Sequence, residues 1–131
     1  KKLDFFMSDS GELSTLKDFV ENDKTSIPAN TDLRKKSGKM ISVETISLND
    51  VIKEYFRDIC PSYISIDTEG SEYEILKSFN LNKFRPKFFT IEHNFTENES
   101  KIDELLIING YVRIFRKLTS FDAWYIQKED L

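Results

Sequence analysis

Residues 63–76 read YISIDTEGSEYEIL, and this stretch indicates how the chain folds. Its beginning is rich in β-branched and aromatic residues and ends in an acid, Asp67, which predicts a short strand. Residues 68–70 (TEG) are typical of a turn. Ser71 and, three residues later, Glu74 form a capping pair that predicts a helix with its apolar residues turned inward. The stretch is therefore a unit of strand, acidic turn and helix.

A second unit of the same kind follows. Residues 87–92 (KFFTIE) predict a strand, and residues 97–109 predict a helix that ends at Gly110. Two successive units of this kind imply parallel strands that are linked by right-handed crossovers. Residues 111–116 and 121–127 then predict an antiparallel hairpin that closes the sheet edge.

The segment before the first unit is less regular. Residues 2–7 and 40–46 predict strands, and residues 12–22 predict a weak helix. Residues 23–39 are polar and predict a loop. Ser47 predicts the N-terminus of a further amphipathic helix. Together these patterns predict one α/β domain over residues 1–131, with helices on both faces of a mostly parallel sheet and a terminal antiparallel hairpin.

Composition excludes several classes of protein. The chain has 131 residues and a net charge of −4, so no positive field attracts nucleic acid. The longest apolar run, residues 105–108, is four residues long, far below the roughly 20 that a transmembrane helix needs. The single cysteine, Cys60, excludes an internal disulfide and favours a reducing, cytoplasmic setting. We expect Cys60 to be a buried structural thiol rather than a nucleophile.

Acidic residues stand at the carboxyl ends of the two predicted parallel strands, where open α/β sheets bind their ligands. Asp67 and Glu92 occupy equivalent positions, so we expect their carboxylates within several ångströms of each other. Such a pair can act as a general base, bind a divalent metal or hold a substrate hydroxyl. His93, the only histidine, suits either proton transfer or a hydrogen-bonded spacer. Glu72 is favourable near a helix N-terminus even without a function.

The stretch 63–76 resembles the D-x-E-G-x-E segment of the FkbM-type methyltransferases, enzymes that use S-adenosylmethionine. Four other landmarks of the family follow the same order along the chain: VETISLND (43–50), TIEHN (90–94), NGY (109–111) and FDAWY (121–125). The resemblance covers most of residues 43–125. A bare D-x-E-G-x-E would be weak evidence, whereas five landmarks in order are much stronger.

The resemblance implies the Rossmann-like fold of class I methyltransferases, whose first half carries a Gly-rich loop that binds the cofactor. The four glycines of this chain, at positions 11, 38, 70 and 110, are isolated, so no G-x-G is present. The chain, which starts at Lys1, therefore resembles the C-terminal half of such a domain. We expect it to bind S-adenosylmethionine weakly or not at all by itself.

The resemblance also implies roles for the acidic residues. Asp67 is the candidate that lies beside the transferring methyl group and so contacts the cofactor. Glu92 is the candidate base and His93 its orienter. The candidates that hold acceptor hydroxyls or a metal are Glu69 and Glu72, with Asn94 as a further substrate-binding residue. The implied acceptor is a hydroxyl on a glycan or a secondary metabolite.

Two other functions remain open at this point. A magnesium-dependent nuclease or phosphatase would use Asp67, Glu69 and Glu92 as metal ligands. It would also need a nearby cation to stabilise phosphoryl charge, and Arg85 and Lys87 lie at the wrong end of their strand. Alternatively, the chain is a non-catalytic module that forms homo-oligomers along an unpaired strand edge.

Overall fold

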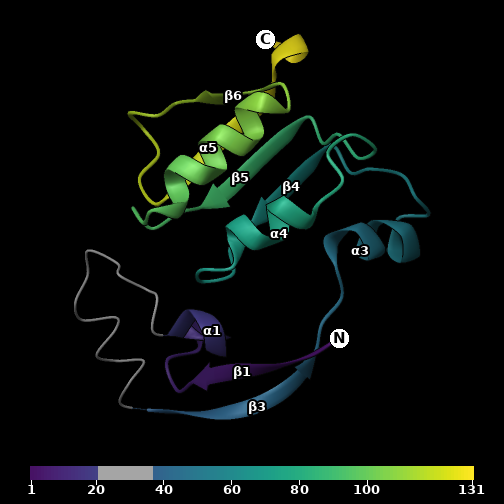
Figure 1. Cartoon of the computed structure of the whole chain (residues 1–131). Helices are drawn as coiled ribbons and strands as arrows, with labels where there is room; N and C mark the ends of the chain where they lie inside the picture. The colour runs from purple at the N-terminus through teal and green to yellow at the C-terminus, as the bar shows by residue number, and fades with distance from the viewer. Residues whose placement is uncertain (21–36) are drawn as a thin grey trace.

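The computed structural model describes residues 1–20 and 37–131, so most of the predicted polar segment 23–39 lies outside the described residues (Figure 1). The strands form two sheets, with the orders β2-β1-β3 and β4-β5-β7-β6. None of the helices in the described part of the chain combines the length and the apolar character that are needed to span a bilayer.

The smaller sheet is built from the first part of the chain. Its strands are β1 (Lys2–Ser8), β2 (Thr15–Leu16) and β3 (Gly38–Glu44), and both of its pairings are antiparallel. The strand predictions for residues 2–7 and 40–46 are confirmed. The helix prediction for residues 12–22 is wrong over residues 12–16, because Thr15 and Leu16 pair with β1 instead. A 3₁₀ turn (Gly11–Leu13) precedes β2, and a four-residue helix α1 (Lys17–Val20) follows it.

Helix α3 (Leu48–Tyr55) connects the two sheets, and it begins as predicted. The Ser47 hydroxyl accepts a hydrogen bond from the Asp50 amide at 3.1 Å, which satisfies one of the free amides of the first turn. Ile52 is the buried residue of this helix. Cys60, which follows the helix, packs against the core, and burial raises the pKa of its thiol. A raised pKa fits a structural cysteine rather than an activated nucleophile.

The larger sheet holds the two predicted strand–turn–helix units. β4 (Tyr63–Ile66) runs parallel to β5 (Phe88–Glu92), and β7 (Asp122–Gln127) lies between β5 and β6 (Tyr111–Ile114), antiparallel to both. The α/β class and the terminal hairpin are therefore confirmed. Only one of the three pairings is parallel, so a mostly parallel sheet is not confirmed.

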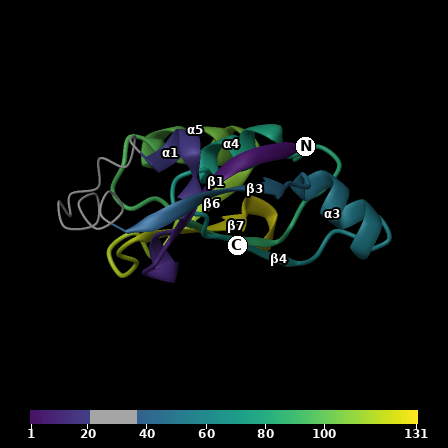
Figure 2. The ribbon, with the colours of Figure 1, turned by 90° about the horizontal axis from the view of Figure 1, so that it is seen from below.

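Helices α4 (Glu72–Ser78) and α5 (Asn98–Ile108) lie on the same face of the larger sheet (Figures 1 and 2). Between them and the strands lies the main core, which includes Leu76, Phe89, Ile91, Ile102, Leu106 and Tyr125. The opposite face carries a row of rings, in which Phe88 stands 5.7 Å from Tyr63 and 5.9 Å from Trp124 between centroids. Because α4 and α5 share one face, the predicted three-layer arrangement is not confirmed. A last 3₁₀ turn, η2 (Lys128–Asp130), follows β7.

The packing of α5 predicts unequal effects of one substitution at two positions. Ile102 is fully buried against the sheet, whereas Ile108 on the same helix is 75% exposed. We expect Ile102→Ala to lower the free energy of unfolding by about 2–5 kcal/mol, and Ile108→Ala to change it by less than about 0.5 kcal/mol. Urea unfolding of both variants measures this difference. Equal losses would contradict the assigned orientation of the helix.

Candidate active site

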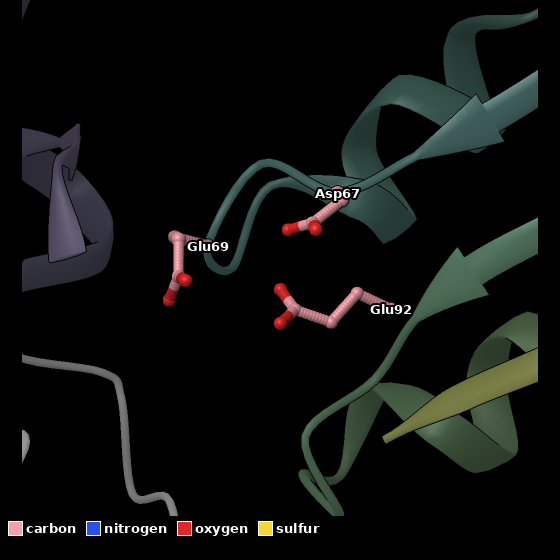
Figure 3. A group of neighbouring side chains, drawn as sticks. All are labelled: Asp67, Glu69 and Glu92. Carbon is pink, nitrogen blue, oxygen red and sulfur yellow. The ribbon is translucent and has the colours of Figure 1, made fainter. Parts of the chain in front are cut away.

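The parallel pairing of β4 and β5 brings two acidic loops to one edge of the sheet. In this pairing Ile66 lies opposite Ile91, so Asp67 and Glu92 leave the two strands side by side. Glu69 reaches the same place from the turn after β4 (Figure 3). One carboxylate oxygen of each of the three residues lies within 4.8 Å of the other two. The predicted proximity of Asp67 and Glu92 is confirmed, and we call the three side chains the acidic cluster.

Glu92 lies in an environment that favours its protonated form. Its Oε2 atom is buried and has no hydrogen-bond partner among the described residues. Burial raises the pKa of Glu92 to about 8 from its usual value near 4.5, and the charges of Glu69 and Asp67 add to the increase. The Asn94 side chain acts in the opposite direction. A carboxyl group whose pKa lies near neutrality can exchange a proton with a substrate under physiological conditions.

The same cluster has the donor set of a divalent cation site. Mg²⁺ and Ca²⁺ bind carboxylate oxygens, and three of them from Asp67, Glu69 and Glu92 could ligate one ion. A cation there would relieve the repulsion among the carboxylates. A shared proton would relieve part of the same repulsion. The residues therefore fit either a general base or a metal site.

Glu72 contacts its own loop rather than the acidic cluster. Its side chain is buried, and its Oε1 atom accepts hydrogen bonds from the Thr68 amide at 2.8 Å, the Thr68 hydroxyl at 2.9 Å and the Gly70 amide at 3.0 Å. The expected cap by Ser71 is absent, because its hydroxyl donates to the Thr68 hydroxyl instead. Glu72 thus closes the turn that carries Asp67 and Glu69.

The turn after β4 also needs support from the N-terminal segment, which sequence analysis missed. Glu69 and Gly70 both adopt positive φ angles, of 57° and 121°. The fully buried Thr15 donates its hydroxyl to the Glu69 carbonyl at 2.8 Å, and Phe19 packs so closely that a Cβ atom at Gly70 would lie 3.2 Å from it. No local pattern reveals a contact between residues 54 positions apart.

His93 points away from the acidic cluster, into a buried group of charged side chains. Its Nδ1 atom accepts a hydrogen bond from the Phe95 amide at 3.0 Å, and its Nε2 atom lies 3.3 Å from Arg113. Burial lowers the pKa of His93, although the nearby Glu99 carboxylate opposes this shift. A neutral ring suits the acceptor role of Nδ1. The Nδ1 atom is occupied by the Phe95 amide and the Nε2 atom faces the Arg113 guanidinium, so these contacts direct neither ring nitrogen at Glu92.

The turn after β5 presents the remaining predicted residue. Asn94 and Phe95 have φ angles of 45° and 55°, a conformation that non-glycine residues rarely adopt. The Phe121 carbonyl holds this turn by accepting hydrogen bonds from the amides of His93 at 2.8 Å and Asn94 at 3.3 Å. Strained backbone of this kind clusters at functional sites, and here it follows both parallel strands.

A cavity of about 440 Å³ opens between the two turns. Four predicted residues line it: Glu69, Glu72, His93 and Asn94. Phe19, Phe95 and Lys101 also line it, and sequence analysis did not identify them. A volume of this size suits a small-molecule ligand. Because Glu69 belongs both to the cavity wall and to the acidic cluster, a bound ligand would lie next to this cluster.

The raised pKa of Glu92 predicts a pH-dependent stability. Between about pH 4.5 and pH 8 the unfolded chain has Glu92 ionised while the folded protein keeps it protonated, so the free energy of unfolding falls as the pH rises. Glu92→Gln cannot ionise and removes this loss. Relative to the wild type, we expect the variant to gain about 1–3 kcal/mol on going from about pH 5 to about pH 8 in urea unfolding. Exposed Glu104 provides the control variant Glu104→Gln, and an equal gain there would contradict the assignment.

The loop contacts of Glu72 predict that its substitution lowers the free energy of unfolding more than substitution of a neighbouring glutamate does. Glu72→Gln replaces one acceptor oxygen by an amide group that cannot accept from Gly70 or Thr68, so we expect unfolding to become easier by about 1–3 kcal/mol. Glu74→Gln, in the same turn of α4 but exposed, should cost less than about 0.5 kcal/mol. Thermal unfolding of both variants measures the difference, and similar losses would refute the loop-closing role.

Comparison with known proteins places this site within a family. The family model described as the Methyltransferase FkbM domain matches residues 3–123, a span that includes the acidic cluster, both strained turns and the cavity. Searches of the curated proteins and of the solved structures gave no significant match. The match covers nearly the whole chain, and the chain therefore belongs to the FkbM methyltransferase family.

Proposed function

We propose that this chain forms the acceptor side of an S-adenosylmethionine-dependent methyltransferase that methylates a hydroxyl group on a glycan or a secondary metabolite. The main support is the acidic cluster at the carboxyl edge of two parallel strands, next to a cavity, in a member of the FkbM family. S-adenosylmethionine, when bound, supplies an electrophilic methyl group on its sulfonium sulfur.

Glu92 is the proposed general base. The acceptor hydroxyl gives its proton to the Glu92 carboxylate while its oxygen forms a bond to the methyl carbon and the bond from that carbon to sulfur breaks. A carboxylate with a pKa of about 8 holds this proton more firmly than an ordinary glutamate does. The buried Oε2 atom has no hydrogen bond among the described residues that a proton from the hydroxyl would have to displace.

The other residues position the reacting groups. Asp67 is the proposed neighbour of the transferring methyl group and the cofactor contact of this chain. Glu69 and Asn94 are the proposed partners of acceptor hydroxyls, since both line the cavity. Glu72 and His93 are proposed to act indirectly. Their hydrogen bonds hold the turns that carry the acceptor-binding side chains.

The donor-binding loop is proposed to lie outside these 131 residues, because the four glycines of the chain are isolated and none forms a G-x-G motif. We also propose a cytoplasmic enzyme, since the single cysteine suits a reducing compartment.

A metal-dependent reaction is the second candidate, and the acidic cluster is the observation that favours it. Asp67, Glu69 and Glu92 would hold Mg²⁺, either to bind the acceptor hydroxyl of a methyltransferase or to serve a nuclease or phosphatase. Cleavage of nucleic acid or of a phosphate ester that requires Mg²⁺ would support the hydrolase. Methyl transfer that chelation by EDTA abolishes would support a metal within the methyltransferase.

Calorimetry and a methyl-transfer assay on the full-length protein test the proposal. We expect S-adenosylmethionine to bind, and labelled methyl groups to pass to a hydroxylated acceptor. Glu92→Gln should lower kcat/KM by about 10²–10⁴-fold, because it removes the base. For the wild type, kcat/KM should rise with pH and level off above about 8, since the base acts when deprotonated.

Glu104→Gln is the matched control, because this exposed glutamate lies on α5 and outside the acidic cluster. Its kcat/KM should match that of the wild type. Absence of S-adenosylmethionine binding by the full-length protein would refute the function. Transfer that survives both Asp67→Asn and Glu92→Gln would refute the roles of these residues.

A further inference from the structure

The turn after β5 holds a large apolar side chain in an unfavourable place. Phe95 has a φ angle of 55°, and the residue is 52% exposed, although it borders the cavity. Left-handed backbone costs a bulky residue about 1–3 kcal/mol, and exposure forgoes the gain from burying its ring. Folding alone would favour glycine or a polar residue at this position.

Hydrogen bonds and ring contacts with neighbouring residues stabilise this backbone conformation of Phe95. The Phe95 amide donates to Nδ1 of His93 at 3.0 Å, and the Thr96 amide donates to the His93 carbonyl at 2.8 Å. The Phe95 ring packs edge-on against His93 at 5.4 Å and against Phe121 at 5.5 Å between centroids. These contacts hold the ring on one side and leave about half of the residue accessible.

The other residues that line the cavity are partly aromatic and partly polar, and this combination indicates which kind of ligand the Phe95 ring contacts. Phe19 adds a second aromatic side chain from α1, while Glu69, Asn94 and Lys101 supply carboxylate, amide and ammonium groups. Aromatic walls favour flat or apolar faces of a ligand, and convergent polar groups bind its hydroxyls. A ring that carries hydroxyls and has an apolar face satisfies both kinds of wall.

We propose that Phe95 is an acceptor-contacting residue that packs on the apolar face of a hydroxylated ring bound in this cavity, and that His93 positions it by accepting the Phe95 amide. The ring is either aromatic or that of a sugar, since both present an apolar face and hydroxyl groups. This inference rests on the proposed function, because the bound hydroxyl is the group that would be methylated. It gives Phe95 and His93 a role in acceptor specificity rather than in proton transfer.

Binding of simple probes tests the inference without any methyl transfer. We would titrate catechol, and separately methyl β-D-glucopyranoside, into the full-length protein labelled with [¹⁵N]phenylalanine, in the absence of a methyl donor. At least one probe should shift the amide signals of Phe95 and Phe19. The probe that does so identifies the ring as aromatic or as a sugar. If neither probe shifts them, the inference is overturned.

Phe115 offers a closely matched control. Phe115 is also a phenylalanine with a left-handed backbone conformation, at a φ angle of 53°, and the residue is 55% exposed. Its ring, however, packs on Trp124 and is not part of the cavity wall. Phe95→Ala should weaken probe binding by about 2- to 10-fold, the loss of one aromatic contact, and Phe115→Ala should leave it unchanged. Equal effects of the two substitutions would overturn the assignment of Phe95.

The positioning role of His93 has its own pair of variants. Asparagine at position 93 can present an oxygen near the place of Nδ1, so His93→Asn should keep probe affinity within about 2-fold. His93→Leu offers no acceptor and should weaken binding as Phe95→Ala does. Equal affinities of the two variants would overturn the role of His93, and if His93→Leu does not fold, the Phe95 and Phe115 variants still decide whether Phe95 contacts the ring.

The outcomes separate this inference from the proposed function. Probe binding needs neither the donor nor the base, so it can succeed even if the full-length protein binds no S-adenosylmethionine. Conversely, methyl transfer with unchanged acceptor KM in Phe95→Ala would overturn the role of Phe95 and leave the methyltransferase intact.

Discussion

The parallel pairing of β4 with β5 is the constraint on which the rest of the site depends. Side chains at the ends of neighbouring parallel strands leave the sheet at the same edge, so the pairing of Ile66 with Ile91 is enough to bring Asp67 next to Glu92. An antiparallel pairing of the same strands would send the two acids to opposite edges. Burial raises the pKa of Glu92, and the electrostatic repulsion from the neighbouring carboxylates adds to the increase. The proximity of the carboxylates thus originates in the direction of two short strands.

The two turns at the acidic edge are held by hydrogen bonds from their backbone amides to the side chains of Glu72 and His93. Glu72 accepts hydrogen bonds from two backbone amides of the turn after β4. His93 accepts a hydrogen bond from the Phe95 amide in the turn after β5. Both turns contain non-glycine residues with positive φ angles, and such conformations persist only where surrounding contacts determine them. Glu72 was predicted to bind the acceptor or a metal and His93 to orient the base, and in the structure both side chains accept hydrogen bonds from the backbone of these turns.

Local patterns predicted the elements that local energetics determine. The cap at Ser47 and the strands at residues 63–66 and 88–92 follow from hydrogen bonding and side-chain shape within a few residues, and the structure contains all of them. The helix expected at residues 12–22 is absent over residues 12–16, because Thr15 and Leu16 gain more from pairing with β1 than from an isolated helical turn. Phe19 and Phe95 escaped notice for a related reason, since the contacts that give them a place at the cavity are made by segments distant in the chain or by backbone angles that composition does not encode.

The bond from the Thr15 hydroxyl to the Glu69 carbonyl has a practical consequence for anyone who wishes to transplant this acidic loop. A graft limited to the D-x-E-G-x-E segment would leave behind Thr15 and Phe19, which brace the turn from the other sheet. The smallest unit that could be grafted is consequently discontinuous in sequence. It comprises the loop together with β2 and α1, which contact it through Thr15 and Phe19.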